Sequence, residues 1–344
     1  MSKSRGIIRY EELFPDRVIR AAELGHYKVV ESGQIVLNKM SAATGAVGRA
    51  NERGLVSPDY AVLSPSDNSD SRYLSYLLGS DGFCRNEVEP RLQGIGVGDV
   101  SNARTPRVTM TSYLSPAAFL PQVDTQRAIA DYLDRETGEI DTMIAKMDEL
   151  AETLELRRRT FIEDVFAAIT SPKVALHHVV KFRSGQDYKR VSDESGDVPV
   201  YGSGGIFATA NDYLYHGESV LFGRKGTVDR PLHVNGRFWT IDTMFYTELS
   251  EGICGRWLYY WATTIPFSLY STDTALPSMT SSTLGRLKLP LIDPTEQRRI
   301  ADHLDEVTGK IDAMLAKVAE LKSLLIERRA ALITDVVTGR KAVA

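Results

Sequence analysis

Two glycine-rich segments, both in the second half of the chain, have the composition of ligand-binding turns. They are Gly202–Gly205 and Gly223–Gly226, and the second carries the adjacent cations Arg224 and Lys225. Neither segment has the spacing of a nucleotide-binding P-loop, and glycine runs of this kind commonly form hairpin turns. Glycine on both sides of Arg224 and Lys225 lets the backbone approach a ligand closely. The pattern favours a binding turn over a catalytic one.

Other candidate catalytic groups lack suitable partners. Ser57–Tyr60 resembles the signature of adenine methyltransferases, but it has no amide or carboxylate at its first position, and no glycine-rich loop for the methyl donor is evident. His177 and His178 are adjacent, which is not metal-ligand spacing, and no C-x-x-C pair accompanies the other histidines. We therefore expect no catalytic residue, metal or cofactor in this chain.

The elements that must position these turns include an internal repeat. Gln126–Val165 and Gln297–Val336 align without a gap and agree at 22 of 40 positions. Repeats of this kind determine the architecture of a protein. Here they predict a long helix that occurs twice, once after each of two strand-rich arms.

Both copies have the apolar periodicity of a coiled coil, with steps of four and three residues. The predicted seam positions are Ile129, Leu133, Ile140, Met143, Met147, Leu150 and Leu154 in the first copy, and Ile300, Leu304, Val307, Ile311, Met314, Val318, Leu321 and Leu325 in the second. Each seam then reaches an arginine, Arg157 or Arg328. Helices of about 40 to 45 residues, or roughly 60 to 70 Å, are expected. Asp124 and Asp293 are the predicted N-caps, and antiparallel pairing is favoured because the second arm can then sit at one end.

The remaining sequence has short β-like runs separated by glycine turns, which indicates mixed α/β arms. The strands expected are 34–37, 60–63, 219–222 and 243–246, and helices are expected over 72–83 and 255–265. Gly33–Lys39 corresponds to Gly217–Gly223, so the arms are themselves divergent copies. The predicted organisation is α/β (α+β): arms at 1–121 and 171–290, and helical spacers at 122–170 and 291–344.

Composition limits the possible partners. The formal net charge is −4 and the pI is about 5.9, which disfavours indiscriminate binding to phosphates. Cys84 and Cys254 lie one in each arm. The sequence has neither an apolar run long enough to cross a bilayer nor a secretory signal, so a cytoplasmic protein without membrane contact is expected.

The chain is identified, by resemblance, with the specificity subunit of type I restriction-modification systems. The motifs that resemble its helical regions are Leu289–Ala301, Glu327–Ile333 and Val336–Gly339. Those that resemble its target-recognition domain are Tyr201–Gly205, Tyr213–Tyr215, Gly223–Thr227, Phe238–Thr243 and Leu276–Thr280. The first arm departs from this pattern, because it opens at Arg5–Ile8, which resembles a point inside the domain. A first recognition domain truncated at its N-terminus is therefore expected.

The resemblance implies a non-catalytic subunit that reads an interrupted sequence in double-stranded DNA, one half-site with each arm. The implied partners are two methyltransferase subunits, which methylate adenine, and the motor-nuclease subunits, which cleave the DNA. The alternative is a coiled-coil adaptor that binds protein only.

Candidate DNA contacts are basic residues of the recognition-like loops, because Lys and Arg bind phosphates. They are Lys39, Arg49, Arg53 and Arg91 in the first arm, and Lys181, Arg183, Lys189, Arg190, Arg224, Lys225 and Arg230 in the second.

Overall fold

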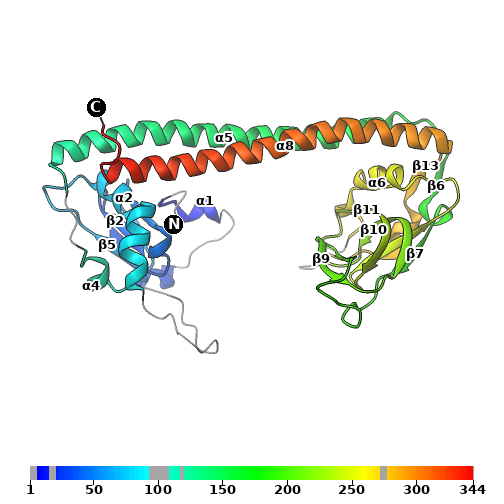
Figure 1. The fold of residues 1–344 in the computed structure, drawn as a ribbon, viewed down its shortest axis with the longest axis horizontal. Coiled ribbons are helices and arrows are strands. Elements are labelled where there is room, and N and C mark those ends of the chain that lie inside the picture. Colours follow the sequence, from blue (N-terminus) through cyan, green and yellow to red (C-terminus); the bar gives the residue numbers. More distant parts are fainter. Residues whose placement is uncertain (1–5, 15–20, 93–107, 117–119, 272–276, 344) are drawn as a thin grey trace. The chain divides into compact units, whose positions relative to one another are not determined.

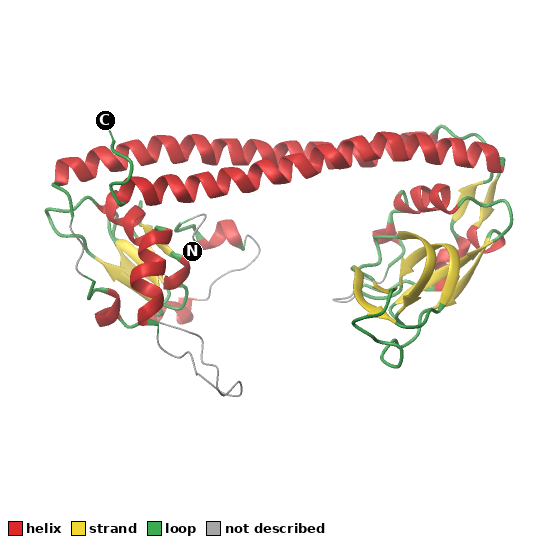
Figure 2. Ribbon diagram, in the orientation of Figure 1, coloured by secondary structure: helices red, strands yellow, loops and turns green. Residues whose placement is uncertain are grey.

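The computed structural model describes residues 6–14, 21–92, 108–116, 120–271 and 277–343 (Figures 1 and 2). Leu276 and Arg5, which belong to two of the sequence motifs above, lie outside these residues. The chain divides into two compact units. Unit 1 comprises Met1–Asp148 with Ala319–Ala344, and unit 2 comprises Glu149–Val318.

Two long helices run through both units, as the repeat predicts. Helix α5 spans Val123–Ala167 (45 residues) and α8 spans Pro294–Val337 (44 residues). Asp293 caps α8, accepting a hydrogen bond from the backbone N–H of Thr295 at 2.8 Å. The predicted cap of α5 is wrong, because α5 begins at Val123 and Asp124 lies in its first turn. Among the described helices, none combines the length and the apolarity needed to cross a membrane.

Within each unit the two helices are antiparallel. In unit 1, Ile129 and Leu133 near the start of α5 share a core with Ile333 and Val336 near the end of α8. In unit 2, Ile162 and Phe166 at the end of α5 pack with Ile300, Ala301 and Leu304 at the start of α8. An equivalent ion pair connects α5 and α8 in each unit: Arg329–Asp141 at 2.8 Å in unit 1 and Arg158–Asp312 at 2.9 Å in unit 2. Each member of one pair occupies the same position of the repeat as its counterpart in the other.

The seam differs from the predicted one at alternate positions. Four predicted seam residues are 42% to 51% exposed, namely Met143, Leu150, Met314 and Leu321. The buried positions include Thr137 and Thr308, whose hydroxyls donate to the carbonyls of Leu133 and Leu304. A threonine bonded to its own helix can be buried without an unsatisfied hydroxyl, which a count of apolar residues does not detect. The inward arginines are Arg158 and Arg329, whereas Arg157 and Arg328 are exposed.

The globular part of unit 2 contains a six-stranded sheet. Its order is β7-β12-β10-β11-β8-β9, and β11 and β8 are its one parallel pair among the described strands. The strands are β7 (Val180–Ser184), β8 (Val198–Gly202), β9 (Gly205–Ala210), β10 (Tyr215–Gly223), β11 (Leu232–Thr240) and β12 (Met244–Leu249). A separate pair, β6 (Lys173–Ala175) and β13 (Lys288–Pro290), joins the ends of this region. Helix α6 (Gly255–Thr263) buries Trp257 and Leu258 in the core that also contains Ile300 and Leu304 of α8.

Unit 1 repeats the centre of this plan. Its three-stranded sheet has the order β3-β2-β5, equivalent to β11-β10-β12, and α2 follows β5 as α6 follows β12. The strands are β1 (Lys28–Val30), β2 (Ile35–Asn38), β3 (Val47–Arg49), β4 (Gly54–Val56) and β5 (Tyr60–Leu63), with β1 and β4 forming a separate pair. All four predicted strands are thus present. The helix predicted over 72–83 is divided by the extended residue Ser80 into α2 (Ser71–Gly79) and α3 (Asp81–Phe83).

Short helical segments complete both units. They are α1 (Tyr10–Leu13), α4 (Met110–Tyr113) and α7 (Ser281–Arg286); the 3₁₀ turns Ala21–His26, Ala42–Thr44, Glu89–Arg91, Leu176–His178 and Phe267–Leu269; and a π-turn at Cys84–Val88.

Candidate nucleic-acid interface

Backbone hydrogen bonds gather several loops of unit 2 at one end of its sheet. The N–H of Gln186, just after β7, donates to the carbonyl of Thr240 at the end of β11 at 2.8 Å. The N–H of Arg224, just after β10, donates to the carbonyl of Thr243 at 2.8 Å. We call residues 185–186, 201–204, 224–226, 241–243 and 277–278 the sheet-end surface. Its loops are anchored to strand ends, so their side chains have defined positions.

The turn at Arg224 and Lys225 is the exposed basic part of this surface. The guanidinium of Arg224 lies 5.7 Å from the centre of the Phe245 ring and donates a 3.5 Å hydrogen bond to the Asp242 carbonyl. Lys225 forms a β-bridge with Ser278, and the N–H of Gly226 donates to the Pro277 carbonyl at 3.0 Å. The turn is therefore held on both sides while its two cations face outward.

Glycine is required where this surface is most tightly packed. A Cβ atom on Gly185 would lie 2.0 Å from the carbonyl oxygen of Ile241, and one on Gly223 would lie 2.2 Å from that of Thr227. Gly226 has a φ of +84°, a conformation that L-residues rarely adopt. By contrast, a Cβ on Gly204 would meet nothing within 4 Å. Glycines 185 and 223 therefore serve close backbone packing at the sheet end.

Lys189 and Arg190 lie on the segment that leaves this surface. The segment begins at Gln186, whose carbonyl accepts a hydrogen bond from the indole N–H of Trp239 at 3.0 Å. It then runs beside β9, where the ring centre of Tyr188 is 5.2 Å from that of Phe207. Both cations are exposed. They extend the basic character from the Arg224 turn towards the edge strand.

The other predicted contacts in unit 2 lie elsewhere. Lys181 and Arg183 are on the edge strand β7, and Arg183 forms a bidentate ion pair with Glu248 at 2.8 and 3.4 Å. Arg230 lines a groove of about 620 Å³ beside α5, with Arg158 and Arg159. These three predicted contacts are not part of the sheet-end surface.

In unit 1, the backbone of Lys39 makes the contact that the backbone of Arg224 makes in unit 2, one residue away from the sequence alignment that places Lys39 opposite Gly223. The N–H of Val108 donates to the Lys39 carbonyl at 3.4 Å, as that of Met279 donates to the Arg224 carbonyl at 3.0 Å. The three predicted arginines of this unit have partners inside it. Arg49 donates to Ser71 and Asn51, each at 2.8 Å, Arg53 pairs with Glu31 at 3.1 Å, and Arg91 pairs with Glu87 at 3.0 Å.

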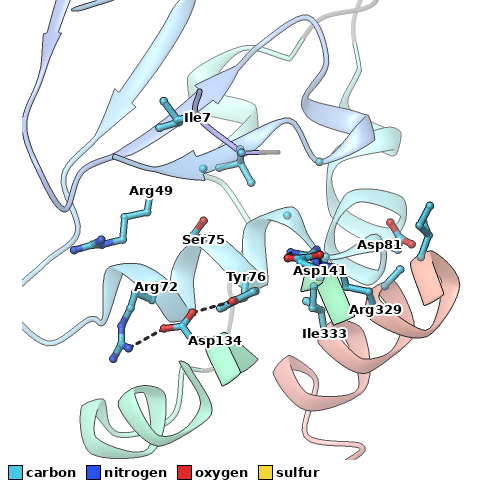
Figure 3. Close-up of a pocket in the computed structure, with 18 of the residues that line it drawn as sticks. Ile7, Arg49, Arg72, Ser75, Tyr76, Asp81, Asp134, Asp141, Arg329 and Ile333 are labelled. Atoms are coloured by element: carbon cyan, nitrogen blue, oxygen red, sulfur yellow. Dashed lines mark hydrogen bonds and ion pairs between the residues drawn. The ribbon is translucent and has the colours of Figure 1, made fainter. Parts of the chain in front are cut away.

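A larger groove of about 990 Å³ lies in unit 1, lined by α2, β3, α5 and α8 (Figure 3). It is formed where α2 rests on α5, and Figure 3 shows Arg72 and Tyr76 of α2 both bonded to Asp134. Burial raises the pKa of Tyr76 to about 12, so its hydroxyl stays protonated and donates to that carboxylate.

The groove of unit 2 occupies the equivalent place on the partner long helix. Its lining residues Arg158, Arg159 and Ile162 correspond in the repeat to Arg329, Ala330 and Ile333, which line the groove of unit 1. Within the described residues, no group of three or more His, Cys, Asp or Glu side chains could hold a metal ion. Neither groove therefore has the ligand set of a metal centre.

Sequence reasoning missed the residues that dock each domain helix on a long helix. They are Arg72, Tyr76, Gln126, Asp131, Asp134 and Thr137 in unit 1, and Arg256, Tyr260, Gln297, Asp302, Asp305 and Thr308 in unit 2. A signal was present, because Arg-x-x-x-Tyr and Gln-x₄-Asp-x₂-Asp-x₂-Thr each occur in both halves of the sequence. It was not recognised because the two patterns lie far apart along the chain.

Comparison with known proteins finds a family model and solved structures that resemble this arrangement. Residues 172–323 match the family model of the type I restriction modification DNA specificity domain. This segment contains all six sheet strands of unit 2, α6 and most of α8. The match therefore covers the whole globular part of unit 2, including the sheet-end surface.

Most of the chain shares its fold with a solved structure from a study of complex assembly and conformational transition of the type I restriction-modification system. The TM-score is 0.72 at 18% identity, over 90% of this chain and 83% of that one. Two further matches are the HsdS subunit from Thermoanaerobacter tengcongensis (TM-score 0.48, 18% identity, 91% and 82% coverage) and the type I S subunit from M. genitalium (TM-score 0.46, 15% identity, 89% and 83% coverage). No curated protein sequence matches. The chain resembles the specificity subunit of type I restriction-modification systems, as its motifs predict.

Proposed function

We propose that this chain reads a bipartite target in double-stranded DNA, one half-site with each globular domain. In this role it directs adenine methylation and restriction by methyltransferase and motor-nuclease subunits. The observation that carries the proposal is the Arg224–Lys225 turn, where two exposed cations stand on a backbone fixed by hydrogen bonds to Thr243 and Pro277. Phosphate contacts from such cations position a protein on DNA, and neighbouring polar side chains can then read bases.

Gln186, Ser203 and Thr243 are the polar side chains at the sheet end that suit base reading. An amide can bond an adenine with both of its polar atoms, and a hydroxyl can both donate and accept. Lys39 supports an equivalent role for unit 1, because its carbonyl accepts a backbone hydrogen bond from Val108 as that of Arg224 does from Met279. The basic residues that are already paired, such as Arg183 and Arg53, are better suited to holding their own domains together.

The paired helices support the spacer role. Each is continuous over at least 44 residues, and the same Arg–Asp pair joins them in both units. A continuous helix of that length extends roughly 66 Å at 1.5 Å per residue, or about two turns of DNA. This length suits half-sites that are separated by unread base pairs.

The test is to sequence methylated adenines in a host that expresses this chain with its methyltransferase subunits. An interrupted motif with two defined halves is the expected result, and it should disappear when this chain is omitted. Methylation that is independent of the chain would contradict the proposal. Retained binding to the methyltransferase without any DNA binding would identify the protein-only adaptor instead.

A further inference from the structure

The docking of α6 on α8 in unit 2 uses five polar contacts spread along both helices. The side-chain oxygen of Gln297 accepts from the backbone N–H of Cys254 at 2.9 Å, just before α6 begins. Arg256 donates to Asp302 at 2.7 Å and also to Asp305. The hydroxyl of Tyr260 donates to Asp305 at 2.6 Å and lies 3.0 Å from that of Thr308. The contacts extend from residue 297 to 308, roughly 16 Å of helix.

Unit 1 contains the same set on α2 and α5. Gln126 accepts from the N–H of Asp70 at 2.9 Å, and Arg72 donates to Asp131 and Asp134 at 2.7 and 2.9 Å. Tyr76 donates to Asp134 at 2.8 Å and lies 3.1 Å from the Thr137 hydroxyl. Every side chain of the unit 1 set has the same residue type as its counterpart in unit 2. The one difference is the residue that offers its backbone N–H, which is Asp70 in unit 1 and Cys254 in unit 2. We refer to both sets as the docking clusters.

Both units form the docking cluster although the chain segment that connects the domain helix to the long helix differs in length between them. The tyrosine and its aspartate are 58 residues apart in unit 1 but only 45 in unit 2. The connection therefore does not determine where the domain helix lies on the long helix. The contacts that recur with the same geometry are those of the cluster.

Apolar packing alone would fix this position poorly. Hydrophobic attraction is non-directional, so a shift of the domain helix would replace one set of apolar contacts by another. Hydrogen bonds depend on distance and angle, and Gln297 and Thr308 are 1% and 2% exposed, so a shift would leave buried polar groups without partners. Asp302 is 65% exposed, and a pair in that environment adds little to stability. The cluster is thus better suited to fixing a position than to stabilising the fold.

We infer that the docking clusters are positioning devices for DNA reading. In unit 2 the register of the DNA-reading domain on its long helix is set by Arg256, Tyr260, Asp302 and Asp305, and in unit 1 by their counterparts. The clusters thereby set the separation of half-sites that the subunit accepts. This inference rests on the function proposed above. The four named residues of unit 2 act through the domain they hold and are not DNA contacts.

The test uses the assembled complex of this chain with its methyltransferase subunits. The variant Arg256→Lys with Tyr260→Phe keeps the charge and the apolar volume, but lysine cannot bridge two carboxylates as the planar guanidinium does. The control is Arg299→Lys, since Arg299 forms its ion pair with Glu296 on the same helix at 2.6 Å and holds no domain. Each complex is given a DNA library in which both half-sites are constant and their separation varies.

The wild-type complex and the control should methylate one separation strongly. The variant should recognise the same bases, but its preference for that separation over neighbouring ones should fall by roughly tenfold, the factor expected for loss of one hydrogen bond to a charged group. An unchanged preference in a folded variant would overturn the inference. A change in the bases recognised would also overturn it, because the cluster would then act on the reading surface itself.

A second measurement does not require DNA. Spin labels on Asn211→Cys in the domain and Ala313→Cys on α8, with Cys84 and Cys254 replaced by alanine, report the position of the domain on its helix within unit 2. The distance distribution should broaden or shift in the variant and stay unchanged in the control. An unchanged distribution contradicts positioning. If the wild-type complex binds no DNA but the distribution responds, the proposed function fails while the positioning role of the cluster stands.

Discussion

Replacing both cations of the sheet-end turn, by Arg224→Ala with Lys225→Ala, should weaken DNA binding without unfolding unit 2. Both side chains are exposed. The hydrogen bond from the Arg224 guanidinium to the Asp242 carbonyl is long, at 3.5 Å, and exposed. Among the described residues neither cation forms an ion pair, so their removal leaves no carboxylate there without its partner. The loss of affinity can therefore be attributed to DNA contact.

The salt dependence gives the expected magnitude. Each phosphate neutralised by a protein cation contributes about 0.9 to the slope of log affinity against log salt concentration. Loss of two contacts should lower the slope by about 1.8. Between about 50 and 200 mM salt, the wild-type affinity should then fall by roughly 12-fold more than that of the variant.

The assay is fluorescence anisotropy with a labelled duplex that carries the methylated motif, measured across that salt range. The matched control is Arg286→Ala with Lys288→Ala, which removes the same charge from exposed positions of unit 2 that are neither in the sheet-end surface nor among the candidate DNA contacts. The control should keep the wild-type slope apart from a small general effect of charge. A wild-type slope for the turn variant, or an equal loss in the control, would refute a specific role for this turn.

Three further predictions concern the spacer, the sheet end and unit 2 stability. Inserting one heptad into each long helix, in register with the other, should lengthen the separation of methylated half-sites by about three base pairs, since seven residues add roughly 10 Å; an unchanged separation in the methylome would exclude the spacer role. Gly185→Ala should reduce DNA affinity because its Cβ would lie 2.0 Å from the Ile241 carbonyl, whereas Gly204→Ala has open space; equal affinities in anisotropy would count against the anchored loop. The hydrogen bond from His233 holds the pKa of Glu218 below its ordinary value, so this carboxylate stabilises unit 2 above about pH 4.5 and the contribution is lost as the pH falls through the folded-state pKa. In urea unfolding between about pH 3 and 6, Glu218→Gln should therefore lose stability less steeply on acidification than wild type; identical slopes would contradict it.

The sequence predicted the long helices because their signal is local and repeated. Both copies carry apolar residues at helical spacing over 40 positions, and Asp293 before Pro294 marks one start clearly. The exact seam could not be obtained in this way. Thr137 and Thr308 are polar by type, but each satisfies its hydroxyl within its own helix and is buried. Residue type favours the more apolar Met143 and Met314, yet both are exposed.

The candidate site was predicted less completely, for a physical reason. Whether a cation is available to DNA depends on carboxylates that are distant in sequence, such as Glu248 for Arg183, 65 residues away. The glycine-flanked turn was recognisable because its constraint lies within Gly223–Gly226 itself. The docking clusters depend on contacts between segments 43 to 62 residues apart, so only the repetition of both patterns could have indicated them.

If the chain reads DNA as proposed, each domain offers few cations to the phosphates. Its formal net charge is −4, and Arg49, Arg53, Arg91 and Arg183 are engaged within their own domains. Each domain therefore offers few phosphate contacts, and a domain alone should bind weakly. When two weak sites are linked with the correct separation, the second binding event becomes intramolecular, and the combined affinity can exceed either one by about 10²–10⁴. That gain is lost if the linker does not match the separation of the half-sites. A continuous paired helix and a fixed docking position on it are thus what weakly basic domains require in order to bind one interrupted sequence tightly.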